Sequence, residues 1–228
     1  MDVALVTVGD ELLSGDTVNT NAAWLGEQLT NRGARVERAT TVPDRVADIA
    51  RIVNEYAAEY DAVIVTGGLG PTHDDRTIDS VAAAVGRELE SNETALQWLA
   101  TAGGYERGDL ADGTADLPAD ARPLHNTVGV APGCVVKNVY VLPGVPDEMK
   151  AMFERIEGEF SGQYRHAEFL VVDEPESALI GRFEELQKRF DVTVGSYPGD
   201  NVRVKIESAD EERVKAAIEW LRERTESA

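Results

Sequence analysis

The stretch that most constrains the fold is Ala62–Thr77, which reads AVIVTGGLGPTHDDRT. Its first four apolar residues form a strand-like run that leads directly into the glycine-rich turn Thr66–Thr72. Asp74 and Asp75 follow the turn, and a helical pattern begins at Thr77. A strand, a glycine turn and a helix in this order are typical of open parallel sheets, whose ligands lie at the carboxyl ends of the strands.

This turn has two interpretations. In the first, Gly67, Gly68 and Gly70 let the backbone approach a phosphate, and the free N–H groups of the helix start favour the anion. The adjacent carboxylates of Asp74 and Asp75 would hold a divalent cation or orient a water molecule. In the second, the turn has only a conformational role, with glycines for the bend and aspartates as helix caps. The preceding buried strand favours the first interpretation.

Strand-like runs alternate with helical patterns through the first half of the chain. The expected strands are Val3–Val8, Val36–Val42 and Ala62–Thr66, and the expected helices are Asn19–Arg32, a helix opened by Pro43 and Asp44, and Thr77–Gly86. We expect Gly9–Gly15 to be a loop. This βα alternation predicts an α/β domain with a mostly parallel sheet and helices on both faces.

The next segment is less regular. A helix is expected over Glu93–Ala102, whereas Gly103–Pro123 lacks periodicity and is expected to be mostly loop. Three short strands are expected at Arg122–Leu124, Cys134–Lys137 and Val139–Leu142, with a tight hairpin at Asn138, followed by a helix over Pro146–Glu157.

After about Gly162 the pattern becomes βαββα, which predicts a small α+β domain. We therefore divide the chain into residues 1–163 and 164–228. The alternating strand Val202–Ser208 is a candidate edge for pairing with a second copy.

Acidic side chains follow each of the three expected parallel strands. Asp10 and Glu11 follow the first strand, Asp44 follows the second, and Asp74 and Asp75 follow the third. These loops should meet at one edge of the sheet, where carboxylates suit Mg²⁺ bridging to a phosphate. We expect Asp10, Glu11 and Asp74 to hold the metal. Asp44 and Asp75 are catalytic candidates, although each is equally well explained as a simple helix cap.

Further residues are candidates for contact with the ligand. Arg76 would bind a phosphate oxygen from the first turn of its helix. Thr72, Gly133 and Gly144 lie in turns where the backbone could approach a ligand. His73 is more simply explained as a solvated loop histidine than as a catalytic group.

The charge of the chain limits its partners. Acidic residues number 42 and basic residues 22, which gives a net charge of −20 and makes nucleic acid an unfavourable partner. Such a surface serves either a cationic partner or stability in molar salt, and the scattering of the acids favours salt adaptation. The single cysteine, Cys134, excludes an internal disulfide and is expected to be buried in a strand. No leader and no apolar run of membrane length are visible, so we expect a soluble, cytoplasmic protein.

Four blocks in this order resemble the molybdopterin-binding-like domain of the CinA competence/damage-inducible proteins. They are Gly9–Gly15 with Asn19–Asn21, Thr66–Thr72 with Asp74 and Asp75, Asn126–Gly133, and Leu142–Met149. The resemblance implies a three-layer MogA-like first domain and a small KH-like second domain. The first domain is more distantly similar to MoaB, MogA and MoeA, whose aspartates match Asp44 and Asp75 and whose phosphate loop matches Gly67, Gly68 and Gly70.

The resemblance implies two functions. One is a pyrophosphatase that acts on ADP-ribose-like dinucleotides and depends on Mg²⁺, Mn²⁺ or Co²⁺. The other is binding of molybdopterin in cofactor assembly without hydrolysis. A homodimer is also implied. The chain shows no segment like the amidase domain that some CinA proteins carry, so no amidase activity is expected. The second domain lacks a basic Gly-x-x-Gly clamp, so RNA binding is not expected.

Overall fold

The computed structural model describes residues 1–70, 75–105 and 110–225. The chain divides into two compact units, Met1–Gly162 and Gln163–Ala228. None of the helices in the described ranges is both long and apolar enough to cross a membrane.

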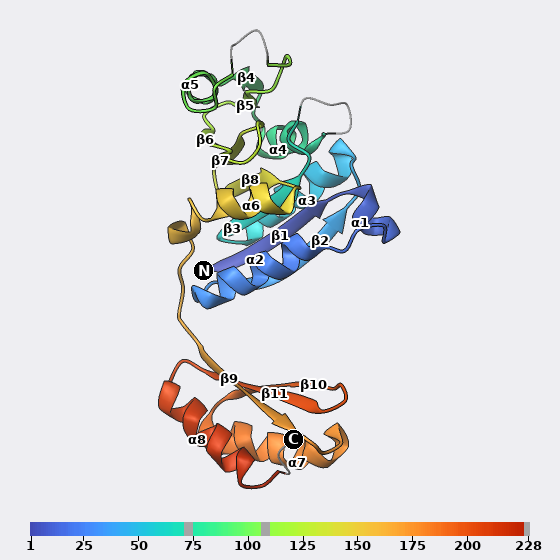
Figure 1. Cartoon of the computed structure of the whole chain (residues 1–228), viewed down its shortest axis with the longest axis vertical. Helices are drawn as coiled ribbons and strands as arrows, with labels where there is room; N and C mark the ends of the chain where they lie inside the picture. Colours follow the sequence, from blue (N-terminus) through green and yellow to red (C-terminus); the bar gives the residue numbers. More distant parts are fainter. Residues whose placement is uncertain (71–74, 106–109, 226–228) are drawn as a thin grey trace. The chain divides into compact units, whose positions relative to one another are not determined.

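The first unit is built on a six-stranded sheet (Figure 1). In spatial order its strands are β2 (Arg35–Val42), β1 (Asp2–Val8), β3 (Ala62–Gly67), β8 (Val139–Pro143), β7 (Gly133–Val136) and β6 (Arg122–Leu124). The first four are parallel, and β7 and β6 continue the sheet antiparallel. The mostly parallel sheet expected from the βα alternation is confirmed, as is the β7–β8 hairpin next to Asn138.

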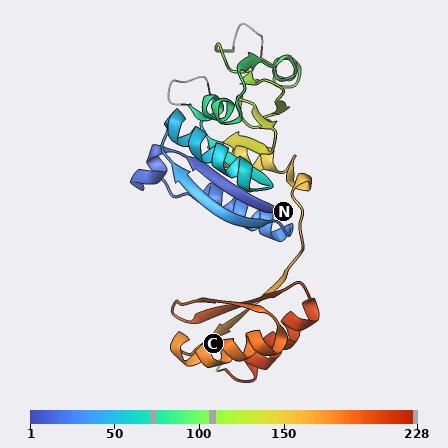
Figure 2. The ribbon, with the colours of Figure 1, turned by 180° about the vertical axis from the view of Figure 1, so that it is seen from behind.

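Helices cover both faces of this sheet (Figures 1 and 2). Along β1, Val3 and Leu5 belong to a core with α2 (Thr20–Asn31) and α6 (Pro146–Phe153). Ala4, Val6 and Val8 point to the opposite core, which contains α3 (Val46–Glu59) and α4 (Thr77–Val85). Burial on both faces explains why the strands read as continuous apolar runs. The unit therefore has three layers.

Several local expectations were wrong. Residues expected to form a loop after β1 instead form the short helix α1 (Asp10–Ser14), which ends at Gly15 in the left-handed region with φ 83°. The stretch expected to be mostly loop contributes β5 (Asp116–Pro118), which pairs with β4 (Leu89–Ser91). The helix expected over Glu93–Ala102, in contrast, is confirmed as α5 (Glu93–Thr101). Helix α6 ends at Phe153 rather than near Glu157, where a separate 3₁₀ turn, Glu157–Glu159, begins.

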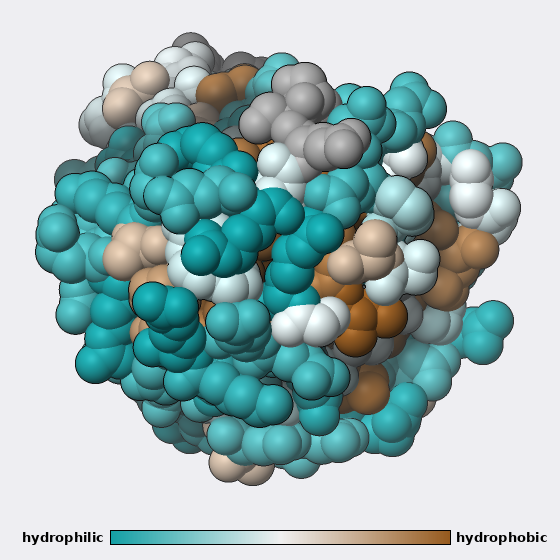
Figure 3. Space-filling model, turned by 90° about the horizontal axis from the view of Figure 1, so that it is seen from below, coloured by the Kyte–Doolittle hydropathy of each residue, from teal (hydrophilic) through white to brown (hydrophobic). Residues whose placement is uncertain are grey.

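The second unit is a βαββα fold. It consists of β9 (His166–Val172), α7 (Glu176–Phe190), β10 (Thr193–Tyr197), β11 (Val202–Ser208) and α8 (Glu211–Arg222), and its antiparallel sheet has the order β10–β11–β9. Val204 and Ile206 of β11 are buried in a core with both helices. Strand β11 is therefore central and pairs on both sides, so the expectation that Val202–Ser208 forms a free edge was wrong. On the face shown in Figure 3, hydrophilic residues predominate.

Candidate ligand site

The carboxyl ends of the parallel strands surround a cavity of about 800 Å³ in the first unit. Its wall is formed by the ends of β1, β3 and β8, the Asp44 loop after β2, and the start of α2. The described lining residues are Val8, Gly9, Glu11, Leu12, Thr17–Asn21, Asp44, Thr66–Gly70, Asp75, Tyr105, Leu110, Ala111, Thr114, Val130, Ala131, Pro143–Pro146 and Glu148. The predicted convergence of loops therefore includes Glu11, Asp44 and Asp75 at one site.

The glycines of the β3 turn leave room for side chains that pack closely against it. Gly67, Gly68 and Gly70 do not adopt the positive φ that glycine permits. A Cβ at Gly70 would lie 2.7 Å from Asp75 Oδ2, and one at Gly68 would collide with the same carboxylate. A Cβ at Gly67 would collide with Thr77 Oγ1. The bare backbone of this turn thus accommodates the Asp75 carboxylate folded against it.

Asp44 was expected to cap α3, the helix that follows it, but its side chain instead bonds to the start of α1. Its Oδ2 accepts a hydrogen bond of 2.9 Å from the backbone N–H of Asp10, the first residue of α1. The N-cap residue of α3 is Arg45, which makes no side-chain cap bond. Likewise, the N-cap residue of α4 is Arg76 rather than Asp75, again without a side-chain cap bond. Neither aspartate is therefore the N-cap residue of the helix that follows it.

The surroundings of Asp44 favour its protonated form. Partial burial raises the pKa of the Asp44 carboxyl above its ordinary value, and the Asp10 N–H opposes this shift. The negative charges of Glu11, Asp10 and Asp75 raise the pKa further. A cation placed among these carboxylates would relieve their repulsion and restore the charged form.

Another part of the cavity wall, at Glu148, is held in place by the buried residue Asn126, which is 1% exposed. Its Nδ2 donates to Glu148 Oε2 at 2.6 Å, and its Oδ1 accepts from the N–H of Gly129 at 2.7 Å. A Cβ at Gly129 would collide with the Glu148 carboxylate. Glu148 lines the cavity but was not among the predicted site residues, so sequence reasoning missed this contribution.

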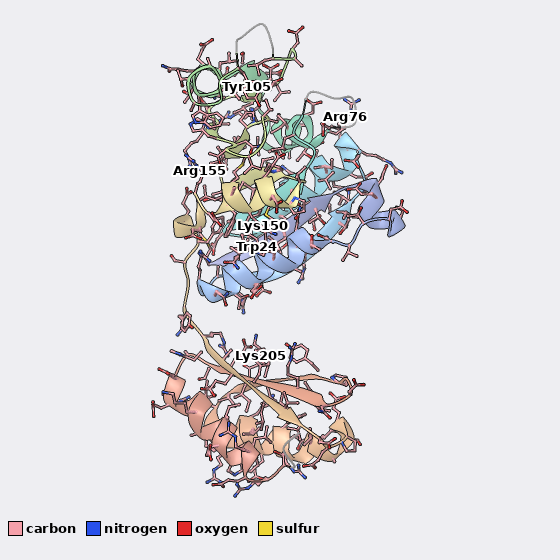
Figure 4. All side chains as sticks on the ribbon, viewed as in Figure 1. Trp24, Arg76, Tyr105, Lys150, Arg155 and Lys205 are labelled. Atoms are coloured by element: carbon pink, nitrogen blue, oxygen red, sulfur yellow. The ribbon has the colours of Figure 1, made fainter. Side chains whose placement is uncertain are left out.

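Other predicted residues lie elsewhere. The Asp10 side chain and Arg76 do not line the cavity in the described chain, and Arg76 Nη1 lies 3.7 Å from Asp79 Oδ2 at the start of α4 (Figure 4). Gly133 is in the core, where a Cβ would meet the Val141 carbonyl and Met152 Sδ. Gly144 lines the cavity and packs on Gly67. Three predicted positions, Thr72, His73 and Asp74, lie outside the described residues.

The charge of the cavity wall is one-sided. Its described residues include four carboxylates, Glu11, Asp44, Asp75 and Glu148, and neither lysine nor arginine. Within the described ranges no three His, Cys, Asp or Glu side chains are grouped closely enough to hold a metal ion by themselves. A phosphate would need a cation and backbone N–H groups to enter such a cavity. By its sheet topology the first unit belongs to the open α/β class, and its cavity lies at the carboxyl ends of the strands, where proteins of that class bind ligands.

The comparisons with known proteins identify the family. Residues 4–160 match the family described as "Probable molybdopterin binding domain", so the chain belongs to that family. The expected fold class, a three-layer α/β domain of the MogA-like kind followed by a small α+β domain, is confirmed.

Individual relatives agree with this assignment. A protein of Archaeoglobus fulgidus is 37% identical over 225 residues, which cover 98% of this chain and 97% of that protein. The crystal structure of CinA from Thermoplasma acidophilum, described as of unknown function, matches 70% of this chain and 97% of its own with 39% identity and a TM-score of 0.64. A CinA-like protein of Citrifermentans bemidjiense is 43% identical over 172 residues, 72% of this chain and 42% of its own. The chain is therefore a CinA-like member of the family.

The second unit matches a different family from the one expected. Residues 165–228 match the family described as "FAD synthase, middle domain". The KH-like assignment is not confirmed, although the βαββα order of elements is as predicted.

Proposed function

We propose that this protein is a metal-dependent pyrophosphatase that cleaves the diphosphate of ADP-ribose-like dinucleotides in the cavity at the β3 glycine turn. The observation that carries the proposal is the carboxylate-lined cavity, which has backbone glycines on the same wall. Its volume of about 800 Å³ is in the range of sites for drug-sized ligands. Because the described wall offers acids and no basic side chain, a diphosphate would enter with a divalent cation.

The donor set suits a hard cation such as Mg²⁺, Mn²⁺ or Co²⁺. Mg²⁺ is commonly held by one or two carboxylates together with substrate phosphates and water, which fits a wall without a preformed group of three ligands among the described residues. In this proposal Asp44 and Asp75 are the catalytic carboxylates and share the site with Glu11. Glu11 and Asp74 remain proposed metal ligands, whereas Asp10, whose side chain does not line the cavity, would contribute through its N–H bond to Asp44. When bound, the cation would supply Lewis-acid activation of the phosphates.

Most of the other predicted site residues are proposed to contact the ligand directly rather than the cation. The backbone of Gly67, Gly68 and Gly70 would lie against the phosphates, and Gly144 would approach from the opposite turn. Thr72 is proposed as a further phosphate contact. For Arg76, its ion pair with Asp79 outside the cavity supports a structural role instead. For Gly133, its place in the core supports a packing role instead.

The second candidate function is binding of molybdopterin without hydrolysis. It is favoured by the description of the matched family. The same cavity would serve both functions, because each ligand joins phosphate to a flat heterocycle and the wall includes apolar side chains such as Leu12, Val18 and Leu110. We further propose that the chain forms a homodimer, which light scattering of the purified protein would test.

The deciding experiment is ADP-ribose hydrolysis by the full chain in molar KCl, with Mg²⁺, Mn²⁺ or Co²⁺ or with EDTA. We expect metal-dependent release of AMP that is lost in Asp75→Asn. Asp79→Asn is the matched control, since Asp79 lies one turn further along at the start of α4 and does not line the cavity. Absence of turnover with every metal would reject hydrolysis of this substrate and favour the molybdopterin-binding alternative.

A further inference from the structure

Buried polar atoms without a hydrogen-bond partner point to one position in the cavity. The described residues include five such side-chain atoms: Asn21 Oδ1, Thr77 Oγ1, His125 Nδ1, Ser196 Oγ and Trp220 Nε1. Of these five residues, Asn21 alone lines the cavity. An acceptor buried without a donor is unfavourable, so in a binding site it indicates that the ligand supplies the donor.

The orientation of the Asn21 amide is determined by its surroundings. Asn21 lies in the first turn of α2 and is 8% exposed. Its Nδ2 donates to the carbonyl oxygen of Gly144 at 2.7 Å, which joins α2 to the turn between β8 and α6. Rotating the amide would place two oxygens against each other, so Oδ1 is the acceptor that stays unpaired.

We propose that Asn21 determines specificity by accepting, through Oδ1, a hydrogen bond from an N–H or O–H on the non-phosphate part of the ligand. This inference rests on the proposed function and specifies which part of the substrate the cavity recognises. The carboxylates of Glu11, Asp44 and Asp75 suit the cation that accompanies the phosphates. The neutral amide oxygen instead suits a neutral donor, such as a sugar hydroxyl or the exocyclic amine of a base.

The test compares two ligands by calorimetry with the full chain, Mg²⁺ and molar KCl. One is the α,β-methylene analogue of ADP-ribose, which resists hydrolysis, and the other is imidodiphosphate, which lacks sugar and base. Asn21→Leu removes the acceptor with little change of shape. We expect its Kd for the ADP-ribose analogue to rise about tenfold, while its Kd for imidodiphosphate stays unchanged.

The matched control is Asn138→Leu. Asn138 Nδ2 also donates to main-chain carbonyls, those of Ala57 and Tyr60 at 3.0 Å each, but it precedes β8 at the end of that strand away from the cavity. We expect this variant to bind both ligands as the wild type does. Equal weakening of both ligands in Asn21→Leu would overturn the inference, because Asn21 would then only hold the Gly144 turn. If the leucine variant fails to fold, Asn21→Ala replaces it.

A third ligand distinguishes the two groups that could donate to Asn21 Oδ1, a sugar hydroxyl and the exocyclic amine of the base. The methylene analogue of IDP-ribose replaces the base amine with a carbonyl. Loss of the Asn21→Leu penalty with this ligand would assign the donor to the amine, and a retained penalty would assign it to a sugar hydroxyl. Binding of the ADP-ribose analogue without turnover of ADP-ribose would reject the proposed hydrolysis alone. Failure of the wild type to bind the analogue would overturn the Asn21 inference.

Discussion

The Asp44 carboxylate accepts a 2.9 Å hydrogen bond from the backbone N–H of Asp10, which links the loop after β2 to the first turn of α1. Because this N–H is one of the unpaired donors at the helix start, Asp44 stabilises α1 while it also lines the cavity. The bond holds the Asp44 carboxylate near the negative charges of Glu11, Asp10 and Asp75, which raise the pKa of Asp44. The hydrogen bond from Asp10 thus fixes the Asp44 carboxyl at a position where, without a metal ion, the surroundings disfavour its ionised form.

The first prediction concerns the stability of Asp44→Asn. The raised pKa means that the folded state holds the Asp44 proton more tightly than the unfolded state. The contribution of the Asp44 carboxyl to the free energy of unfolding is therefore fully present below the ordinary aspartate pKa of about 4. It is lost as the pH rises through the raised pKa of the folded state. We expect the metal-free variant to be more stable than the wild type at pH 7, by less than about 1 kcal/mol because the group is only partly buried.

Urea unfolding in EDTA at pH 7 and pH 3 measures this difference. The amide oxygen introduced by Asp44→Asn can still accept the Asp10 N–H, so the variant and the wild type should be equally stable at pH 3, where Asp44 is protonated. If Asp44→Asn is destabilised by the same amount at both pH values, the carboxylate is a structural cap and its charge carries no penalty.

The second prediction concerns metal binding. A ligand that binds only the folded state raises Tm, and the rise grows with the logarithm of the ligand concentration once this exceeds Kd. We expect Mn²⁺ to raise the Tm of the wild type and of Asp79→Asn equally, and to raise that of Asp44→Asn much less. Thermal unfolding over a Mn²⁺ titration measures the shift. An equal shift in all three proteins would place the metal away from the Asp44 carboxylate.

The third prediction uses Gly68. Its missing Cβ leaves room for the Asp75 carboxylate, so Gly68→Ala should displace that side chain. Because the side chain is flexible, we expect little loss of stability but at least a tenfold loss of ADP-ribose hydrolysis. The control is Gly26→Ala in α2, where a Cβ meets no atom within 4 Å; it should keep full activity and gain about 0.5–1 kcal/mol of stability. Full activity in Gly68→Ala would show that the position of Asp75 does not matter.

The parallel sheet could be predicted from sequence because its signals are local. The apolar runs of β1 and β3 and the turn after β3 each lie within a few residues, and the topology then brings Asp44 and Asp75 to one edge. Helix α1 was missed because it is only five residues long and buries none of them, so it has no apolar periodicity.

The remaining features depend on contacts distant in sequence. The β4–β5 pair joins residues 25 to 29 positions apart with helix α5 between them, so no short hairpin loop signals the pairing. Asn21 contacts Gly144, 123 positions further along the chain, and Asn126 binds Glu148, so neither role could be inferred from spacing. The glycines of the β3 turn lie on the cavity wall, but the packing of Asp75 and Thr77 against them could not be inferred from the sequence.

The fourth prediction tests the packing role of Gly133. A Cβ there would collide with the Val141 carbonyl and lie 2.5 Å from Met152 Sδ, and the backbone atom cannot move aside cheaply. We expect Gly133→Ala to lower the free energy of unfolding by about 1–3 kcal/mol and to leave the KM for ADP-ribose unchanged. Gly158→Ala, with no atom within 4 Å of the added Cβ, is the control. A raised KM with unchanged stability would return Gly133 to the ligand site.

The last prediction concerns the net charge of −20. Exposed charges repel one another over about 10 Å at 0.1 M salt and over only about 3 Å at 1 M. We therefore expect the Tm at pH 7 to rise steadily as KCl increases from 0.1 to 2 M. The same titration near pH 4.5, the isoelectric point, is the control, since the net repulsion has vanished there. Equal salt dependence at both pH values would mean that KCl acts through general solvation of the chain, and the acidic surface would then need another explanation, such as a cationic partner.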